Sequence, residues 1–249
     1  MKRGLAGLGI LAVLVGLVWV FGYRDTTTPP RFEAGDFAGM DMPTALQTLA
    51  DAMVDGGAPG VVLYTWQDGQ TYQAAAGTKN KATGEPMPMD DPLRVASISK
   101  LYTAAIVHGL IAEDRLGLDQ KVSEILPAEI MVGLHNGPDI TVRHLLLHRS
   151  GIPDYYDIRH YLFSDWKNTP LTLERTLPVS KRGKAIGPSG GQFEYSNMGY
   201  ILLGRIAETV SGETYNELLD RLVLTPLGQM RTSYDVKHPV ADSIHGYGT

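Results

Sequence analysis

An uncharged run of apolar residues, from Leu101 to Ala112, most constrains the fold of this chain. A helix of that composition has no polar face of its own and is normally buried in a protein core. Immediately before the run, Ser97 and Lys100 stand three residues apart. At that spacing two side chains lie on the same face of a helix. We therefore expect a core helix that begins with a hydroxyl and an amine directed at the same point.

The pair formed by Ser97 and Lys100 predicts nucleophilic chemistry. A serine hydroxyl is a weak nucleophile until a neighbouring base takes its proton, and a lysine amine in a partly dry environment can be that base. The spacing alone decides little, because a serine that caps a helix before a solvated lysine gives the same letters. The apolar helix that follows favours the chemical interpretation, since it places Lys100 beside a dry interior.

Composition excludes several classes of function. The chain has 249 residues and a formal net charge of −5, and the absence of a basic stripe argues against a nucleic-acid partner. It has no cysteine, which excludes disulfides, cysteine-ligated zinc and a thiol nucleophile. No His-x-x-x-His pair or carboxylate cluster indicates a metal site. We expect no cofactor and no obligate protein partner.

The first 24 residues predict a membrane segment. Lys2 and Arg3 precede an uncharged apolar run over residues 4–22. At about 1.5 Å per helical residue, this run approaches the hydrocarbon thickness of a bilayer. An uncleaved anchor with its positive end inside fits this length, and a cleaved signal peptide is the alternative. In either case we expect the rest of the chain outside the cytoplasm, anchored at the periplasmic or extracellular face, or secreted.

The remainder of the chain predicts one domain after a linker. Residues 25–42 include Thr-Thr-Thr-Pro-Pro and little apolar periodicity, as in a tether. Residues 43–249 predict a helix-rich α/β domain. Within it, Asp68-Gly69 indicates the turn of a hairpin between strands 61–66 and 71–76. We also expect a loop over 78–92, a turn and a short helix over 116–126, and helices over 43–54, 141–148, 171–177, 197–209 and 214–224.

Several segments together resemble the serine β-lactamase-like family, which includes class C β-lactamases, D-alanyl-D-alanine carboxypeptidases and related esterases. The segments occur in the family's order along residues 43–249. They are Leu93–Lys100, Leu116–Pro127, Ile140–Pro153, Phe193–Gly204 and Pro226–Thr232. Five ordered matches are far more specific than any one of them. The resemblance implies a β-lactamase/transpeptidase-like α/β (α+β) fold, with a helical region against an antiparallel sheet.

The resemblance also implies roles for four residues. Ser97 would attack a carbonyl and form an acyl-enzyme, and its backbone N–H would supply half of an oxyanion hole. Lys100 is the expected proton acceptor, and Tyr195 a second acid/base group for the leaving amine and the incoming water. Which of these two is the base stays open, because coupled groups titrate as a unit. Asn197 would hydrogen-bond Lys100 and the substrate carbonyl. A core tyrosine and a helix cap are the alternative interpretations of Tyr195 and Asn197.

Other residues invite a functional interpretation that the sequence does not favour. His148 would suit a Ser-His-Asp mechanism, but the chain has no Gly-x-Ser-x-Gly elbow. We therefore expect His148 to be structural and His108 to be a core histidine. Tyr64 and Trp66 are expected in the strand core.

One motif of the family is missing from this sequence. We find no Lys-Thr-Gly or His-x-Gly motif for a late strand beside the site, and His245–Gly248 follows Asn197 too soon to be one. We therefore expect a C-terminally truncated domain with an incomplete sheet, half an oxyanion hole and weak or no catalysis. We expect a serine hydrolase that acts through an acyl-enzyme on β-lactam, D-Ala-D-Ala peptide or ester acyl donors. A non-catalytic penicillin-recognising or interaction protein is the alternative.

Overall fold

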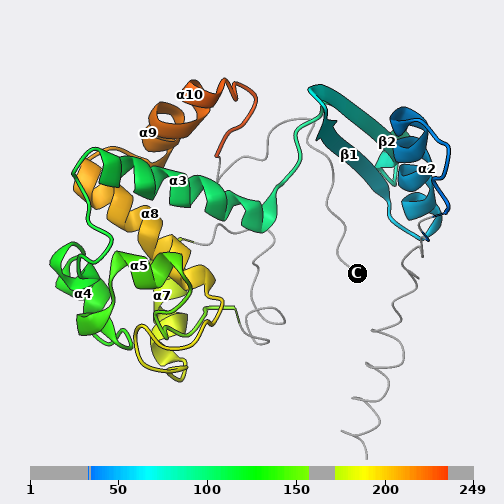
Figure 1. Ribbon diagram of the computed structural model, residues 1–249. Helices are drawn as coiled ribbons and strands as arrows, with labels where there is room; N and C mark the ends of the chain where they lie inside the picture. The colour runs from blue at the N-terminus through cyan, green and yellow to red at the C-terminus, as the bar shows by residue number, and fades with distance from the viewer. Residues whose placement is uncertain (1–32, 34, 157–171, 235–249) are drawn as a thin grey trace, which may run out of the picture. The chain divides into compact units, whose positions relative to one another are not determined.

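The computed structural model describes residues 33, 35–156 and 172–234 (Figure 1). The predicted membrane segment over residues 4–22 lies outside this part of the chain. Within it, none of the helices has both the length and the apolar character needed to span a bilayer.

The described residues form two compact units, one ending at Arg94 and the other beginning at Val95. The first unit is a helix packed on an antiparallel sheet with strand order β1-β2-β3. Its elements are α2 (Met42–Asp55), β1 (Gly60–Gln67), β2 (Gln70–Asn80) and β3 (Glu85–Pro86). The predicted helix and hairpin are confirmed. At the hairpin turn, Asp68 and Gly69 both have positive φ, as a two-residue turn of this kind requires.

The sheet departs from the prediction in two respects. The expected loop over 78–92 contains the end of β2 and all of β3, because a turn closed by the Gly84 N–H and the Asn80 carbonyl sends the chain back along β2. Burial of Tyr64 and Trp66 is also wrong, since they are 67% and 66% exposed. Side chains alternate along a strand, and the neighbouring Leu63 is on the face that packs against α2.

The second unit is helical and is built around α3 (Ser99–Ala112) and α8 (Asn197–Ser211), which pack side by side (Figure 1). Its buried core includes Ile106, Leu202 and Ile206. The other helices are α4 (Ala128–Met131), α5 (Val142–Leu146), α7 (Leu173–Arg182), α9 (Tyr215–Leu219) and α10 (Thr225–Leu227). Shorter turns are η1 (Ala96–Ile98), η2 (Val122–Glu124), η3 (Gly137–Asp139) and the π-helical η4 (Asp220–Leu224).

The helix α3 is buried on one side only. Ile106, Val107 and Leu110 are fully buried, whereas Leu101 is 70% exposed and His108 is exposed. The predictions of a helix buried all round and of a core histidine are therefore wrong in this unit. A helix can be apolar on every side and still be covered by the rest of the chain on only one of them.

Most of the other predicted helices are confirmed with shifted ends. Thr141 caps α5 as expected, and α8 ends at Gly212, which has a φ of +73°. The turn and short helix expected over 116–126 are confirmed, and the helix is η2. The backbone there also bonds to the segment before α5, as when the Val122 N–H donates to the Ile140 carbonyl.

Truncation of the fully buried Leu202 on α8 should destabilise the second unit. We expect Leu202→Ala to lower the free energy of unfolding by about 2–5 kcal/mol, because the substitution leaves a cavity in the core. Leu227→Ala, at a position that is 65% exposed, is the matched control and should change it by no more than about 0.5 kcal/mol. Denaturant unfolding followed by circular dichroism measures both, and equal effects of the two substitutions would contradict this packing.

Candidate active site

Ser97 and Lys100 stand at the start of α3, as predicted. Ser97 lies in the η1 turn, directly after Ala96, whose φ of +43° is in the left-handed region. That conformation is unfavourable for a residue with a Cβ and is often retained at functional sites. One turn later, Lys100 brings its Nζ to 3.3 Å from the Ser97 Oγ. The sequence spacing therefore does place the amine against the hydroxyl.

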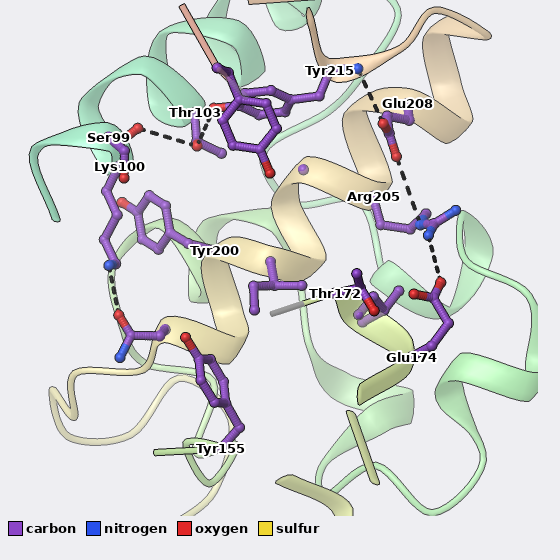
Figure 2. Close-up of a pocket in the computed structure, with 15 residues that line it drawn as sticks. Ser99, Lys100, Thr103, Tyr155, Thr172, Glu174, Tyr200, Arg205, Glu208 and Tyr215 are labelled. Atoms are coloured by element: carbon purple, nitrogen blue, oxygen red, sulfur yellow. Dashed lines mark hydrogen bonds and ion pairs between the residues drawn. The ribbon is translucent and has the colours of Figure 1, made fainter. Parts of the chain in front are cut away.

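The Lys100 ammonium is held by partners from a distant part of the chain. Its Nζ donates a hydrogen bond of 2.7 Å to Asn197 Oδ1, at the first residue of α8 (Figure 2). It also lies 4.9 Å from the ring centroid of Tyr195 and 5.7 Å from that of Tyr200. Both distances are in the range of cation–π attraction. The amine is thereby oriented toward Ser97 from two sides.

Tyr195 completes the contact with the serine. Its hydroxyl donates a hydrogen bond of 2.9 Å to the Ser97 Oγ, and the side chain is 42% exposed. Partial burial by itself raises the pKa of this hydroxyl. Hydrogen bonds with Lys100 and Ser97, and the charge of Lys100, act in the opposite direction, so that the net pKa lies below its usual value. Tyr195 is thus a tyrosine that ionises more readily than an isolated one.

His148 fixes the segment that carries Tyr195. Its carbonyl accepts a hydrogen bond from the Glu194 N–H at 2.8 Å, and its ring Nδ1 accepts one from the Ser196 N–H at 3.1 Å. The imidazole also stacks on the Tyr195 ring, with 4.5 Å between centroids, and lies 5.0 Å from the Tyr200 ring. His148 itself has a φ of +54°. None of these contacts involves Ser97, so His148 acts by positioning the segment that carries Tyr195.

The protonation state of His148 follows from this environment. Burial, and secondarily the positive charge of Lys100, lower the pKa of the imidazole below its usual value. A neutral imidazole can accept the Ser196 N–H at Nδ1, whereas a protonated one carries a hydrogen there.

Asp154 orients the side chain of Asn197. Its Oδ2 accepts a hydrogen bond of 2.7 Å from Asn197 Nδ2, and its Oδ1 accepts the Met198 N–H at the start of α8. The carboxylate can only accept, so the amide nitrogen of Asn197 must face it and the amide oxygen must face Lys100. Asp154 therefore determines which end of Asn197 meets the amine.

All four predicted site residues thus meet within the second unit. Tyr195, Lys100 and Asn197 form one hydrogen-bonded chain around the Ser97 hydroxyl. Sequence reasoning missed the contribution of Asp154, although it directly follows the distinctive stretch Ile140–Pro153.

Two further points concern a metal site and the third motif of the family. Among the residues with described positions, no group of three or more histidine, aspartate or glutamate side chains could hold a metal ion. The segment His245–Gly248, which follows Asn197 too soon to be the third motif, lies outside them.

Comparison with known proteins identifies the family. The Beta-lactamase family model matches residues 46–247. This chain belongs to the beta-lactamase family. The predicted resemblance and the predicted combination of helices with an antiparallel sheet are therefore confirmed.

Relatives in the beta-lactamase family are longer than this chain. Penicillin-binding protein 4 of Amycolatopsis lactamdurans is 28% identical over 68% of this chain and 43% of its own length. A D-aminopeptidase of Cereibacter sphaeroides is 30% identical over 82% of this chain and 39% of its own length. Among solved structures, the D-amino acid amidase of Ochrobactrum anthropi SV3 complexed with L-phenylalanine amide superposes with a TM-score of 0.72. It is 28% identical, over 83% of this chain and 56% of the amidase. The chain thus spans less than half the length of these two curated relatives.

The lowered pKa of His148 makes a specific contribution to acid sensitivity. As the pH falls, His148 becomes protonated in the unfolded state before it does in the native state. The native state therefore loses stability as the pH falls from the usual pKa, near 6.5, to the lower pKa of the folded protein. His148→Asn keeps a side-chain acceptor that does not titrate, and asparagine tolerates positive φ. We expect it to be less stable at pH 7, where the ring stacking is lost, but to show a shallower loss of unfolding free energy from about pH 7 to 5. Urea unfolding across this range measures it, and parallel curves for the two proteins would rule out the assignment.

Loss of the Asp154 carboxylate should uncouple Asn197 from Lys100. We expect Asp154→Ala to slow the reaction of Ser97 with a fluorophosphonate about 10- to 100-fold, because a misoriented amide no longer holds the amine in place. The exposed Asp220→Asn is the control for loss of one carboxylate and should react at the parent rate. Intact mass spectrometry follows the adduct with time. Equal rates for parent and Asp154→Ala would show that Asn197 is oriented by other contacts.

Proposed function

We propose that this chain is a serine hydrolase that acts through an acyl-enzyme on Ser97. One observation carries the proposal: the Ser97 Oγ accepts hydrogen bonds from both Lys100 and Tyr195, at 3.3 and 2.9 Å. A serine in contact with two groups that can exchange its proton is the arrangement that nucleophilic catalysis needs. Membership of a family whose relatives carry hydrolase names supports the same reaction class.

Acylation forms a bond from the Ser97 Oγ to the acyl carbonyl carbon. The serine proton passes to whichever of Lys100 and Tyr195 is unprotonated when the substrate reacts, because both side chains lie within hydrogen-bond distance of the Ser97 oxygen. The oxyanion that develops is stabilised by the Ser97 N–H, which belongs to the first turn of η1, where N–H groups lack partners within the helix. The bond from the carbonyl carbon to the leaving nitrogen or oxygen then breaks, and Tyr195 gives the leaving atom its proton.

Deacylation repeats these steps with water as the nucleophile. Tyr195 is 42% exposed and reaches the Ser97 oxygen, so it can take a proton from a water that approaches the ester carbonyl. The proton returns to the Ser97 oxygen as the acyl group leaves as a carboxylic acid. The lowered pKa of Tyr195 favours this exchange nearer to neutral pH than an ordinary tyrosine allows.

We propose amides, peptides or esters as acyl donors, including β-lactams and peptides that end in D-Ala-D-Ala. The names of relatives support donors with D-configured residues. They include the D-alanyl-D-alanine-carboxypeptidase/endopeptidase AmpH of Escherichia coli, 26% identical over 72% of this chain. The solved structure of EstCE1, a hydrolase with promiscuous acyltransferase activity, supports acyl transfer as the reaction and is 29% identical over 74% of this chain. We further propose that residues 4–22 anchor the domain outside the cytoplasm, or direct its secretion.

Covalent labelling tests the nucleophile directly. The full chain is incubated with benzylpenicillin or an activated ester, and its intact mass is measured over time. We expect an adduct on the parent and on Ser123→Ala, a control at an exposed serine, and none on Ser97→Ala.

The pattern of adducts separates enzyme from binding protein. An adduct that disappears on standing, with release of product, indicates turnover. A permanent adduct favours the alternative of a penicillin-recognising protein without hydrolysis. An adduct that survives in Ser97→Ala, or a folded parent that forms none with any donor, would contradict the proposal.

A further inference from the structure

The segment that supports Tyr195 and Asn197, residues 148–154, is itself held by bonds to three of its consecutive backbone carbonyls. The donors are the Gly190 N–H to Arg149 at 2.8 Å, the Asn136 amide to Ser150 at 3.0 Å and the Ile186 N–H to Gly151 at 3.2 Å. Two of these donors are backbone groups, which any residue could supply. The third is a side chain, so the identity of Asn136 matters to this segment.

The Asn136 side chain bridges two segments that lead to the active site. Its Nδ2 donates to the Ser150 carbonyl at 3.0 Å and to the Gly187 carbonyl at 2.8 Å. A primary amide nitrogen has two hydrogens, so this bridge uses both. Ser150 follows His148 closely in the chain, and Gly187 precedes Tyr195. The amide therefore sets the spacing between the support of Tyr195 and the segment that carries this tyrosine.

The two bridged segments approach each other closely at Gly151. This glycine has a φ of +68°, which is in the left-handed region. A Cβ at Gly151 would collide with the Gly187 carbonyl oxygen and lie 2.6 Å from the Asn136 Nδ2, which is closer than real Cβ contacts. The contact between the segments thus requires both a residue without a side chain and the amide of Asn136.

Local capping does not account for Asn136. It occupies the N-cap position of η3, where an asparagine often bonds to the first turn, but its side chain makes no such bond. Its φ of +59° is one that asparagine adopts more readily than most residues. The amide instead reaches carbonyls that are 14 and 51 positions away in the chain.

The turn that contains Asn136 holds the neighbouring loop at two further points. The Nε2 of His135 lies 2.7 Å from the Gly183 carbonyl oxygen, and the Ser189 hydroxyl donates to the Asp139 carbonyl at 3.2 Å. These bonds remain available when the amide of Asn136 is replaced. Loss of the amide should therefore loosen the bridge locally, without releasing the whole loop.

We propose that Asn136 is a positioning residue of the active site. Its amide fixes residues 148–154, which in turn hold Tyr195 and Asn197 against the catalytic serine and lysine. This inference rests on the proposed function, since it takes Ser97 as the nucleophile. A misplacement of about 1 Å that originates far from the chemistry can slow a reaction by about 100-fold.

Two substitutions remove the donor of Asn136 in different ways. Asn136→Asp keeps the shape and tolerates the positive φ, but it sets a carboxylate oxygen against two carbonyls. Asn136→Gly removes the side chain without adding charge and is unstrained at this φ. If Asn136→Asp does not fold, Asn136→Gly carries the same test. Asn216→Asp, at an exposed position of α9, is the matched control for the added charge.

Reaction of the full chain with a fluorophosphonate measures the reactivity of Ser97. We expect both Asn136 variants to form the adduct about tenfold more slowly than the parent, and Asn216→Asp to react at the parent rate. Intact mass spectrometry follows the adduct, and circular dichroism gives the folded fraction of each protein. A slower reaction that only matches the loss of folded chains would overturn the proposal.

The ionisation of Tyr195 is a readout that lower stability alone does not move. Burial raises the pKa of this hydroxyl, whereas hydrogen bonds with Lys100 and Ser97 lower it to a net value below the usual one. Displacement of the ring from these partners should raise the pKa in both Asn136 variants. NMR of isotopically labelled tyrosine measures it, with the resonance identified by its absence from Tyr195→Phe. A higher pKa in Asn136→Asp alone would be an effect of charge and would also reject the proposal.

The NMR titration needs no substrate, so it separates failure of this inference from failure of the proposed function. A Tyr195 pKa that rises in both Asn136 variants, in a chain that no acyl donor labels, would sustain the positioning role and reject the hydrolase. Labelling of Ser97 at equal rates in the parent and both variants, with an unchanged Tyr195 pKa, would sustain the hydrolase and reject the role of Asn136.

Discussion

His148 accepts hydrogen bonds from the chain on both sides of Tyr195, and Asp154, a short distance along the same segment, accepts one from Asn197. Between them Ile152 is only 1% exposed, so the segment is fixed in the core of the second unit. A shift of this segment would move both side chains that meet Lys100. The geometry around the Ser97 hydroxyl therefore depends on residues 148–154, which act through Tyr195 and Asn197.

The segment that holds Tyr195 and Asn197 also determines the electrostatic environment of Lys100. The ammonium faces the Asn197 oxygen and the rings of Tyr195 and Tyr200, and the Asp154 carboxylate stands behind the amide. Each neighbour presents negative or partly negative atoms to the amine, so its position is held before any substrate arrives. Such preorganisation spares the reaction the cost of reorienting polar groups at the moment when charge develops.

The sequence predicted the local elements well and their surroundings less well. Spacing and turn chemistry located α2, the hairpin and α8, and the paired motifs brought Ser97 and Asn197 to one site. Burial was harder to predict, because the exposure of Leu101 and Trp66 depends on what the rest of the chain covers. The role of Asp154 depends on a contact across 43 positions of the chain, for which no local pattern exists.

Asn197 joins a cation on one side to an anion on the other, which its amide can do because the oxygen accepts and the nitrogen donates. Asparagine is also one of the thermolabile side chains of proteins. Hydrolysis of its amide would exchange a nitrogen for an oxygen and set two carboxylates at the present hydrogen-bond distance of 2.7 Å. Loss of this one amide would therefore disable the site in a chain that is still folded.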